Sequence, residues 1–206
     1  CHENYLVRRY VPLETVEHEL LPFLITRQLY TGAGRVTDQG FEITQRADYL
    51  DEAVSSATTR SRPMVNTRDE PHSDPDEFRR LHVIIGDSNR SQWATWMKLA
   101  VTHLIICVIE EAARLGEDSG FASCALADPG AANRAVSADL TCVTARLRLA
   151  DGSEPVSAVQ MQRRYQAVVR DFMERHHDAV DDALPRTDVD LSLIHISEPT
   201  RLALIS

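Results

Sequence analysis

The densest group of chemically active side chains lies in residues 55–72, whose sequence is SSATTRSRPMVNTRDEPH. If residues 64–70 form a strand, alternation along it places Asn66, Arg68 and Glu70 on one face. A row of amide, guanidinium and carboxylate makes a poor core. It suits a site that binds an anion and a metal together, because guanidinium groups hold phosphate through paired hydrogen bonds and Mg²⁺ prefers oxygen ligands.

Two further arginines, Arg60 and Arg62, precede this stretch and bring more positive charge to the same neighbourhood. Planar guanidinium groups are well suited to phosphate recognition. An alternative remains equally open: residues 64–70 form a solvated edge strand whose charges make surface ion pairs. His72 at the end of the segment fits either a ligand or a structural role.

The first residues, His2-Glu3-Asn4-Tyr5, form a second polar cluster. On a strand, His2 and Asn4 share a face. An ordinary polar strand end accounts for so short a cluster better than a site does. Similarly, His82 lies within an apolar strand, and we expect it to be a hydrogen-bonded core histidine.

Residues 86–89, Gly-Asp-Ser-Asn, follow a buried strand and open a long helix. A helix N-terminus attracts anions. Ordinary capping of the helix by Ser88 or Asn89 is the commoner situation. The sequence contains no GxxxxGK[ST], GxGxxG or HExxH motif, so any nucleotide site is neither a P-loop nor a Rossmann site.

The elements that position these residues mix helices and strands without a regular βαβ rhythm, which predicts an α+β fold. Apolar spacing predicts helices over residues 13–30, with a kink or a new helix at Pro22, and over 91–115 and 158–176. Asp-Pro pairs predict short helices over residues 74–80 and from 128. Strands are expected at residues 2–9, 41–44, 63–70, 81–85 and 143–149, and residues 151–152 have hairpin-turn residues.

Composition narrows the classes of function. The chain has 206 residues and a net charge of −9, from 22 Lys+Arg against 31 Asp+Glu, which argues against broad binding to nucleic acid or an anionic membrane. The longest apolar region, residues 93–109, is interrupted by Lys98, Thr102 and His103, so we expect no membrane span. Four cysteines without CxxC spacing make a zinc site unexpected, and we expect a cytoplasmic protein.

Four stretches in order, CHENYLVRR, PFLITRQLYTGAGRV, VSSATTRSRPMVNTRDEPHSDP and FRRLHVIIGDSN, resemble the Pup ligase and depupylase family. The resemblance runs from Cys1 to about Asp190 and is most specific in the first 110 residues. Family members resemble glutamine synthetase, which implies a curved, mainly antiparallel sheet packed with helices. The leading Cys1 and the run SSATTRSRP resemble the ligase branch more closely.

That resemblance implies an ATP- and Mg²⁺-dependent carboxylate–amine ligase. ATP phosphorylates the side-chain carboxylate of the C-terminal glutamate of Pup, the prokaryotic ubiquitin-like protein, and a substrate lysine attacks the γ-glutamyl phosphate. The product is marked for the proteasome. The implied partners are therefore Pup and lysine-bearing proteins.

The resemblance also assigns roles to residues. RDEPH resembles a glutamine synthetase strand, which makes Glu70 a metal ligand and Arg68 a phosphate contact, while His72 stands where the synthetase has arginine. Further nucleotide contacts are implied for residues of two other motifs, Arg60, Arg62, His2 and Asn4. The catalytic base, an aspartate, is expected before Cys1, so no catalytic residue is expected within the chain.

We therefore expect residues 1–190 to be the central portion of a catalytic domain whose first strands and small C-terminal domain are missing. Such a fragment alone is expected to be inactive. Residues 191–206, LSLIHISEPTRLALIS, resemble a translated sequencing adapter and are not expected to form a domain. Two alternatives stay open: a depupylase that deamidates or removes Pup, and a non-catalytic Pup-binding homologue.

Overall fold

The computed structural model describes residues 2–50, 52–56, 62–68 and 74–176. Four strands form one sheet in the order β1-β6-β5-β4. They are β1 (Glu3–Arg8), β4 (Glu52–Ser55), β5 (Pro63–Asn66) and β6 (Phe78–Val83). β6 pairs antiparallel with both β1 and β5, whereas β4 and β5 run parallel. The expected α+β class, with a mainly antiparallel sheet, is confirmed.

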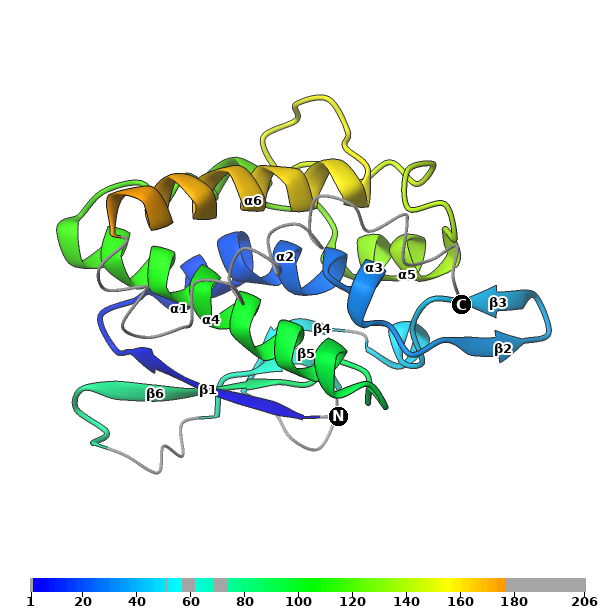
Figure 1. The fold of residues 1–206 in the computed structure, drawn as a ribbon, viewed down its shortest axis with the longest axis horizontal. Helices are drawn as coiled ribbons and strands as arrows, with labels where there is room; N and C mark the ends of the chain where they lie inside the picture. Colours follow the sequence, from blue (N-terminus) through cyan, green and yellow to red (C-terminus); the bar gives the residue numbers. More distant parts are fainter. Residues whose placement is uncertain (1, 51, 57–61, 69–73, 177–206) are drawn as a thin grey trace.

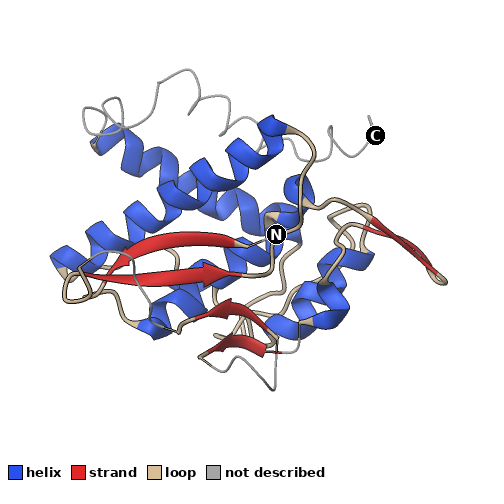
Figure 2. Cartoon of the chain, turned by 90° about the horizontal axis from the view of Figure 1, so that it is seen from below, coloured by secondary structure: helices blue, strands red, loops and turns tan. Residues whose placement is uncertain are grey.

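Helices cover one face of this sheet (Figure 1). In chain order they are α1 (Leu13–Thr15), a π-helical turn (Val16–Leu20), α2 (Leu21–Thr26), α3 (Gln28–Thr31), α4 (Gln92–Leu115), α5 (Pro129–Ala138) and α6 (Ala158–Arg175). Seen from below, the strands lie in front of the helices (Figure 2). A separate hairpin of β2 (Arg35–Thr37) and β3 (Gly40–Glu42) projects from one end of the molecule. Among the described residues, the helices thus cover one face of the sheet and leave the other face uncovered.

The long helix α4 is confirmed, and its ends follow from local chemistry. The Ser91 side chain accepts a hydrogen bond from the Ala94 N–H, and Gly116 ends the helix with a φ of 70°. The expected capping by Ser88 or Asn89 is wrong. By length and composition α4 is apolar enough to cross a membrane, but half of its most apolar window is buried inside this fold. It is the core helix that links the sheet to α6.

The helical layer is closed by α6, which begins with a reciprocal cap between Ser157 and Gln160. Its buried face carries Tyr165, whose ring centroid lies 5.4 Å from that of Phe23 and 4.6 Å from that of Phe121. The Tyr165 hydroxyl donates to the Glu19 carbonyl oxygen at 2.6 Å. This packing joins α6 to the first helical segment. There a new helix, α2, begins at Leu21 with Pro22 in its first turn, in line with one of the two expectations.

The short helix expected over residues 74–80 is wrong. Asp74 instead closes a turn: its Oδ1 accepts the Asp76 N–H at 2.9 Å, and its carbonyl accepts the Phe78 N–H at 3.0 Å. β6 then begins at Phe78 and pairs with β1 over six residues. Pairing with a distant strand therefore overrides the local Asp-Pro signal for a helix.

Other expectations hold in part. In place of a strand over residues 143–149, the chain makes only isolated bridges, between Leu126 and Leu149 and between Leu147 and Val156. β2 and β4 are strands that the sequence patterns did not predict, and β4 ends at Ser55. β5 ends at Asn66, so the expected strand over residues 63–70 is shorter than predicted.

Candidate functional site

The face of the sheet that the helices leave uncovered, called the open face below, is built from β1, β5 and β6. Asn4 is paired with His82, and His82 is paired in turn with Asn66. Directly paired residues project to the same face of a sheet, so these three side chains share it. Glu3 and Val7 alternate with Asn4 on β1 and are buried on the other face. The expected grouping of His2 and Asn4 follows from this alternation.

Two histidines face each other at one end of the open face. His82 Nε2 lies 2.9 Å from His2 Nδ1, and the ring centroids are 4.7 Å apart. Partial burial and the positive charges of Arg46 and Arg80 lower the pKa of His2. Burial, His2 and Arg80 lower the pKa of His82. Both rings are therefore neutral near pH 7, and each can donate one hydrogen bond and accept another.

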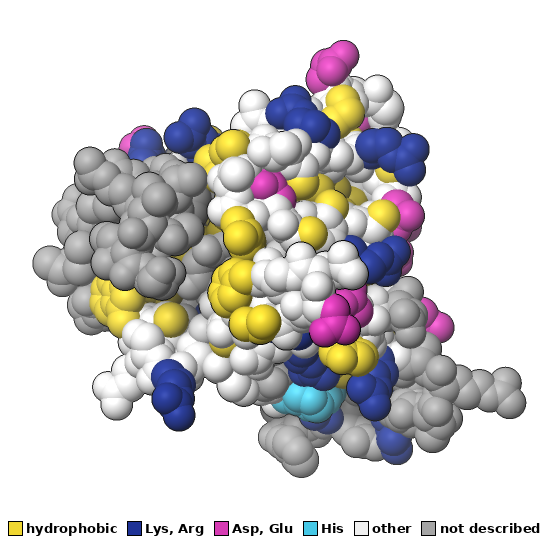
Figure 3. All heavy atoms as spheres, turned by 90° about the vertical axis from the view of Figure 1, so that its right-hand side faces the viewer, with side chains coloured by type: hydrophobic (Ala, Val, Ile, Leu, Met, Phe, Trp, Pro, Cys, Tyr) yellow, Lys and Arg dark blue, Asp and Glu magenta, His cyan; other side chains and the backbone are white. Residues whose placement is uncertain are grey.

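Arginines border this histidine pair. Arg80, on β6, donates from Nε to Asn4 Oδ1 at 2.8 Å. Arg46 reaches in from the loop before residues 47–49 and donates from Nη1 to the Ile84 carbonyl oxygen at 2.7 Å. Figure 3 shows histidine and Lys or Arg side chains gathered together at one edge of the molecule. Neutral imidazoles beside fixed guanidinium groups form a surface that suits phosphate.

The strand that carries the central motif is not an edge strand. β5 lies between β4 and β6, and all four of its residues, including Asn66, are buried. The alternative of a solvated edge strand is therefore wrong for residues 63–66. Beyond the strand, the Asn66 Oδ1 accepts the Arg68 N–H at 2.8 Å, which turns the chain out of the sheet. The common face expected for Asn66 and Arg68 ends with the strand at Asn66.

The expected site residues are only partly brought together. His2 and Asn4 lie on the open face, whereas Arg62 and Arg68 are exposed at opposite ends of β5. The two arginines are thus separated along the chain by the whole of β5, and their common role stays a prediction. The remaining expected residues, Arg60, Glu70 and His72, lie outside the described residues.

The structure adds three residues that sequence reasoning missed: Arg46, Arg80 and His82. His82 was expected in the core, but it is half-buried on the open face against His2. Its apolar neighbours suggested burial because Leu81 and Val83 point to the covered face, while His82 between them points away. The alternation within β6 was therefore a usable signal for His82 and Arg80. No local signal marks Arg46, whose loop reaches the sheet from afar.

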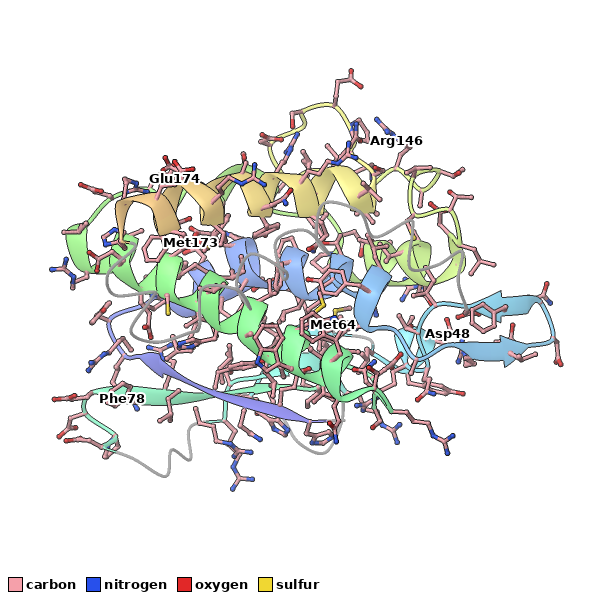
Figure 4. All side chains as sticks on the ribbon, viewed as in Figure 1. Asp48, Met64, Phe78, Arg146, Met173 and Glu174 are labelled. Atoms are coloured by element: carbon pink, nitrogen blue, oxygen red, sulfur yellow. The ribbon has the colours of Figure 1, made fainter. Side chains whose placement is uncertain are left out.

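The open face is distinct from the surface cavity at the other end of α4. That cavity has a volume of about 360 Å³ and is bordered by the loop after β1, the first helices and the C-terminal end of α4. None of the expected site residues lines it. In Figure 4, Phe78 marks the end of β6 that lies farthest from the N-terminus, where β1 runs on toward the cavity.

Comparison with known proteins identifies the family. The sequence profile described as "Pup-ligase protein" matches residues 1–200. A Pup–protein ligase of Bifidobacterium longum subsp. infantis is 72% identical over 189 residues, which are 92% of this chain and 39% of the relative. One from Bifidobacterium animalis subsp. lactis is 57% identical over 184 residues, 89% of this chain and 36% of the relative.

Two solved structures share the fold. One, of the Pup ligase PafA in complex with ADP, has a TM-score of 0.77 and 36% identity, covering 98% of this chain and 44% of that one. The other, of a complex between Pup and its ligase PafA, has a TM-score of 0.78 and 35% identity, covering 98% of this chain and 40% of that one. The class is thus that of α+β proteins with an open sheet packed against helices. The chain belongs to the Pup-ligase family, and it spans about two fifths of the length of the curated relatives it matches.

Proposed function

We propose that the protein represented by this chain is an ATP-dependent Pup ligase. It joins the side-chain carboxylate of the C-terminal glutamate of Pup to lysine ε-amines of other proteins. The observation that carries the proposal is the His2–His82 pair held beside Arg46 and Arg80 on the open face of a chain that belongs to the Pup-ligase family. Relatives of the same fold bind ADP and Pup, which supports these two molecules as ligands here.

The reaction proceeds in two transfers. A carboxylate oxygen of Pup attacks the γ-phosphorus of ATP, and ADP leaves. The lysine amine then attacks the acyl carbon, phosphate leaves with its bonding electrons, and an isopeptide bond forms after loss of a proton from nitrogen. Such phosphoryl transfer depends mostly on positioning and on neutralising phosphate charge. Arg46 and Arg80 supply charge, and His2, Asn4 and His82 supply hydrogen bonds.

Further contacts are proposed from the motifs. Arg62 and Arg68, together with Arg60 and His72, are proposed nucleotide or acyl-phosphate contacts. Glu70 is the proposed ligand of Mg²⁺, which would screen the phosphate charge. The described residues contain no group of three or more His, Cys, Asp or Glu side chains that could hold a metal. The metal part of the proposal therefore depends on Glu70 and on other residues beyond the described ones.

Two alternatives make different predictions. A depupylase would release Pup from conjugates instead of forming them, and a non-catalytic homologue would bind Pup without turning over ATP. The curated relatives at 72% and 57% identity are both named Pup–protein ligases, which favours the ligase. Assaying conjugation, Pup release and ADP formation with one preparation of the full-length protein separates the three.

The deciding experiment substitutes Arg80→Ala in the full-length protein. A hydrogen bond to a charged group contributes about 1.5–3 kcal/mol, so we expect ADP affinity to fall about tenfold or more. Arg170→Ala, on the exposed side of α6, is the control and should leave affinity unchanged. If Arg80→Ala binds ADP and forms conjugates as the parent protein does, the open face is not the nucleotide site.

We also propose that residues 1–190 are the central portion of the catalytic domain and that the protein acts in the cytoplasm without binding membrane or nucleic acid. The burial of half of the most apolar window of α4 inside the fold supports the statement about membranes, and the net charge of −9 supports the one about nucleic acid. We expect this chain alone neither to turn over ATP nor to conjugate Pup. The genomic sequence around residue 191 tests the adapter-like tail, and cell fractionation tests the location.

A further inference from the structure

A buried ion pair lies directly behind the open face. Glu3 and Arg27 join carboxylate Oε1 to guanidinium Nη2 at 2.6 Å, and their side chains are 2% and 0% exposed. Glu3 lies between His2 and Asn4 in the chain, so its side chain projects inward while theirs project outward. The position of Glu3 therefore determines where the two neighbouring side chains lie on the other face.

The carboxylate of Glu3 is held from several directions. Its second oxygen accepts the Tyr5 hydroxyl at 2.6 Å. Burial raises the pKa of Tyr5, so that hydroxyl stays protonated and remains a donor. Arg27 is fixed in turn, because its Nη1 donates to the Lys98 carbonyl oxygen at 3.3 Å and to the Thr102 hydroxyl. The pair thus ties β1 to the junction of α2 with α3 and to α4.

Gly86, in the loop after β6, completes this arrangement. A Cβ atom on Gly86 would lie 2.2 Å from Glu3 Oε1, closer than any real contact. The absent side chain leaves the space that the Glu3 carboxylate occupies. An alanine at this position would displace the carboxylate without changing a charge.

The pair restrains the part of β1 that carries the two site residues. Glu3 stands between His2 and Asn4, and its carboxylate is fixed to Arg27, which belongs to the helical layer. This buried, directional contact adds a fixed point to the hydrogen-bond ladder that joins β1 to β6.

We propose that the Glu3–Arg27 pair, with the space left by Gly86, positions His2 and Asn4 for nucleotide binding. Neither Glu3 nor Arg27 touches the nucleotide; both act through the main chain of β1. The inference rests on the proposed function, because it assumes that the open face holds ATP.

The test separates positioning from stability. Removing one member of a buried ion pair leaves an unpaired charge, whereas replacing both by neutral side chains of similar size often restores stability. In the full-length protein we compare Glu3→Gln, Arg27→Met, the double variant and Gly86→Ala. Thermal midpoint, ADP affinity by calorimetry, and KM for ATP against kcat are measured for each.

We expect the double variant to recover most of the thermal midpoint lost by the single variants, while ADP affinity stays at least about fivefold weaker and KM for ATP rises more than kcat falls. Gly86→Ala should weaken ADP binding to a similar extent. Gly130→Ala, at a glycine with room for a Cβ, should not. Val169→Ala, in the buried face of α6, should lower the midpoint but leave ADP affinity intact.

Three results would overturn the inference: a double variant that regains ADP affinity with its stability, a Gly86→Ala variant with unchanged affinity, or a Val169→Ala variant that loses affinity equally. Failure of the proposed function appears separately, as absent ADP binding in the parent protein. In that event the ring-nitrogen NMR signals of His2 and His82 still test whether the ion pair positions the two histidines. Their mutual hydrogen bond should be lost in the double variant and kept in Val169→Ala; its persistence in the double variant contradicts the positioning role.

Discussion

His2 Nδ1 and His82 Nε2 lie 2.9 Å apart although 80 positions separate the two residues in the chain. The antiparallel register of β1 with β6 creates this contact. Two neutral rings can share one hydrogen, but two protonated rings would repel each other and the nearby Arg80. Protonation of the two rings at acidic pH should therefore destabilise the folded protein.

The first prediction concerns pH. In the folded protein the pKa values of both histidines lie below the ordinary value of 6.5. At a pH between the folded and the unfolded pKa, the unfolded chain therefore binds more protons than the folded protein does. Their contribution to stability is complete above pH 6.5 and is lost as the pH falls below it toward the folded pKa values. Urea midpoints of the full-length protein from pH 7.5 to 5.5 measure this loss. A His2→Gln/His82→Gln variant should show a shallower decline; an equal slope would contradict the assignment.

A second prediction concerns Asp87, which is fully buried in the loop before α4. Its Oδ2 accepts the main-chain N–H groups of Ala33 at 2.9 Å and of Gln45 at 3.0 Å. An Asp87→Asn substitution removes charge from these bonds and brings an amide donor among donors. We expect a loss of about 1–3 kcal/mol in the free energy of unfolding, measured by urea titration.

The same substitution should weaken ADP binding, because the Asp87 carboxylate holds Gln45, the residue before Arg46, and so fixes the loop that carries Arg46. Asp76→Asn, on an exposed turn, is the control and should change neither quantity. An Asp87→Asn protein as stable as its parent would show that these contacts contribute little.

A third prediction tests the start of α6. Ser157 caps the helix through Gln160 and is 2% exposed. Replacing such a cap by alanine costs about 1 kcal/mol. We expect Ser157→Ala to lower the free energy of unfolding by this amount, whereas Ser88→Ala, which is exposed and not the cap of α4, should lie within about 0.5 kcal/mol of the parent. Equal effects of the two substitutions would rule out the cap.

The fourth prediction concerns thiol reactivity. Burial, with the nearby Glu110 or Asp139 carboxylate, raises the pKa values of Cys107 and Cys142 to about 11, and burial also raises that of Cys124. Since the thiolate is the reactive form, these cysteines should resist iodoacetamide at pH 8 in the folded protein. Peptide mass spectrometry before and after unfolding in guanidinium measures the difference. Rapid labelling of Cys142 in the folded state would contradict it.

Much of the fold is readable from the sequence because local signals and tertiary packing agree there. Ser91 and Gly116 bound α4, and the apolar face of α6 follows helical spacing. The helix expected after Asp74 fails because the same residues satisfy a turn, and pairing with β1 then determines the outcome. Local chemistry was ambiguous at Asp74, and the partner strand lies some 70 residues away in sequence.

The site is harder to predict than the fold. Alternation on β1 was enough to group His2 with Asn4, but it could not reveal which strand lies opposite. Register alone brings His82 and Arg80 to them, and a loop with no motif brings Arg46. The buried Glu3 and Arg27 were invisible as a pair, since each looks like an ordinary surface charge until the partner is known.

The space left by Gly86 also limits how this protein can change through evolution. A carboxylate at position 3, a guanidinium at 27 and no side chain at 86 fit one another, and any one of them exchanged alone leaves either an unpaired buried charge or a clash. Neutral drift at these three positions must therefore pass through a less stable ancestor or change two of them together. We therefore expect these three positions to vary together wherever enough related sequences are compared.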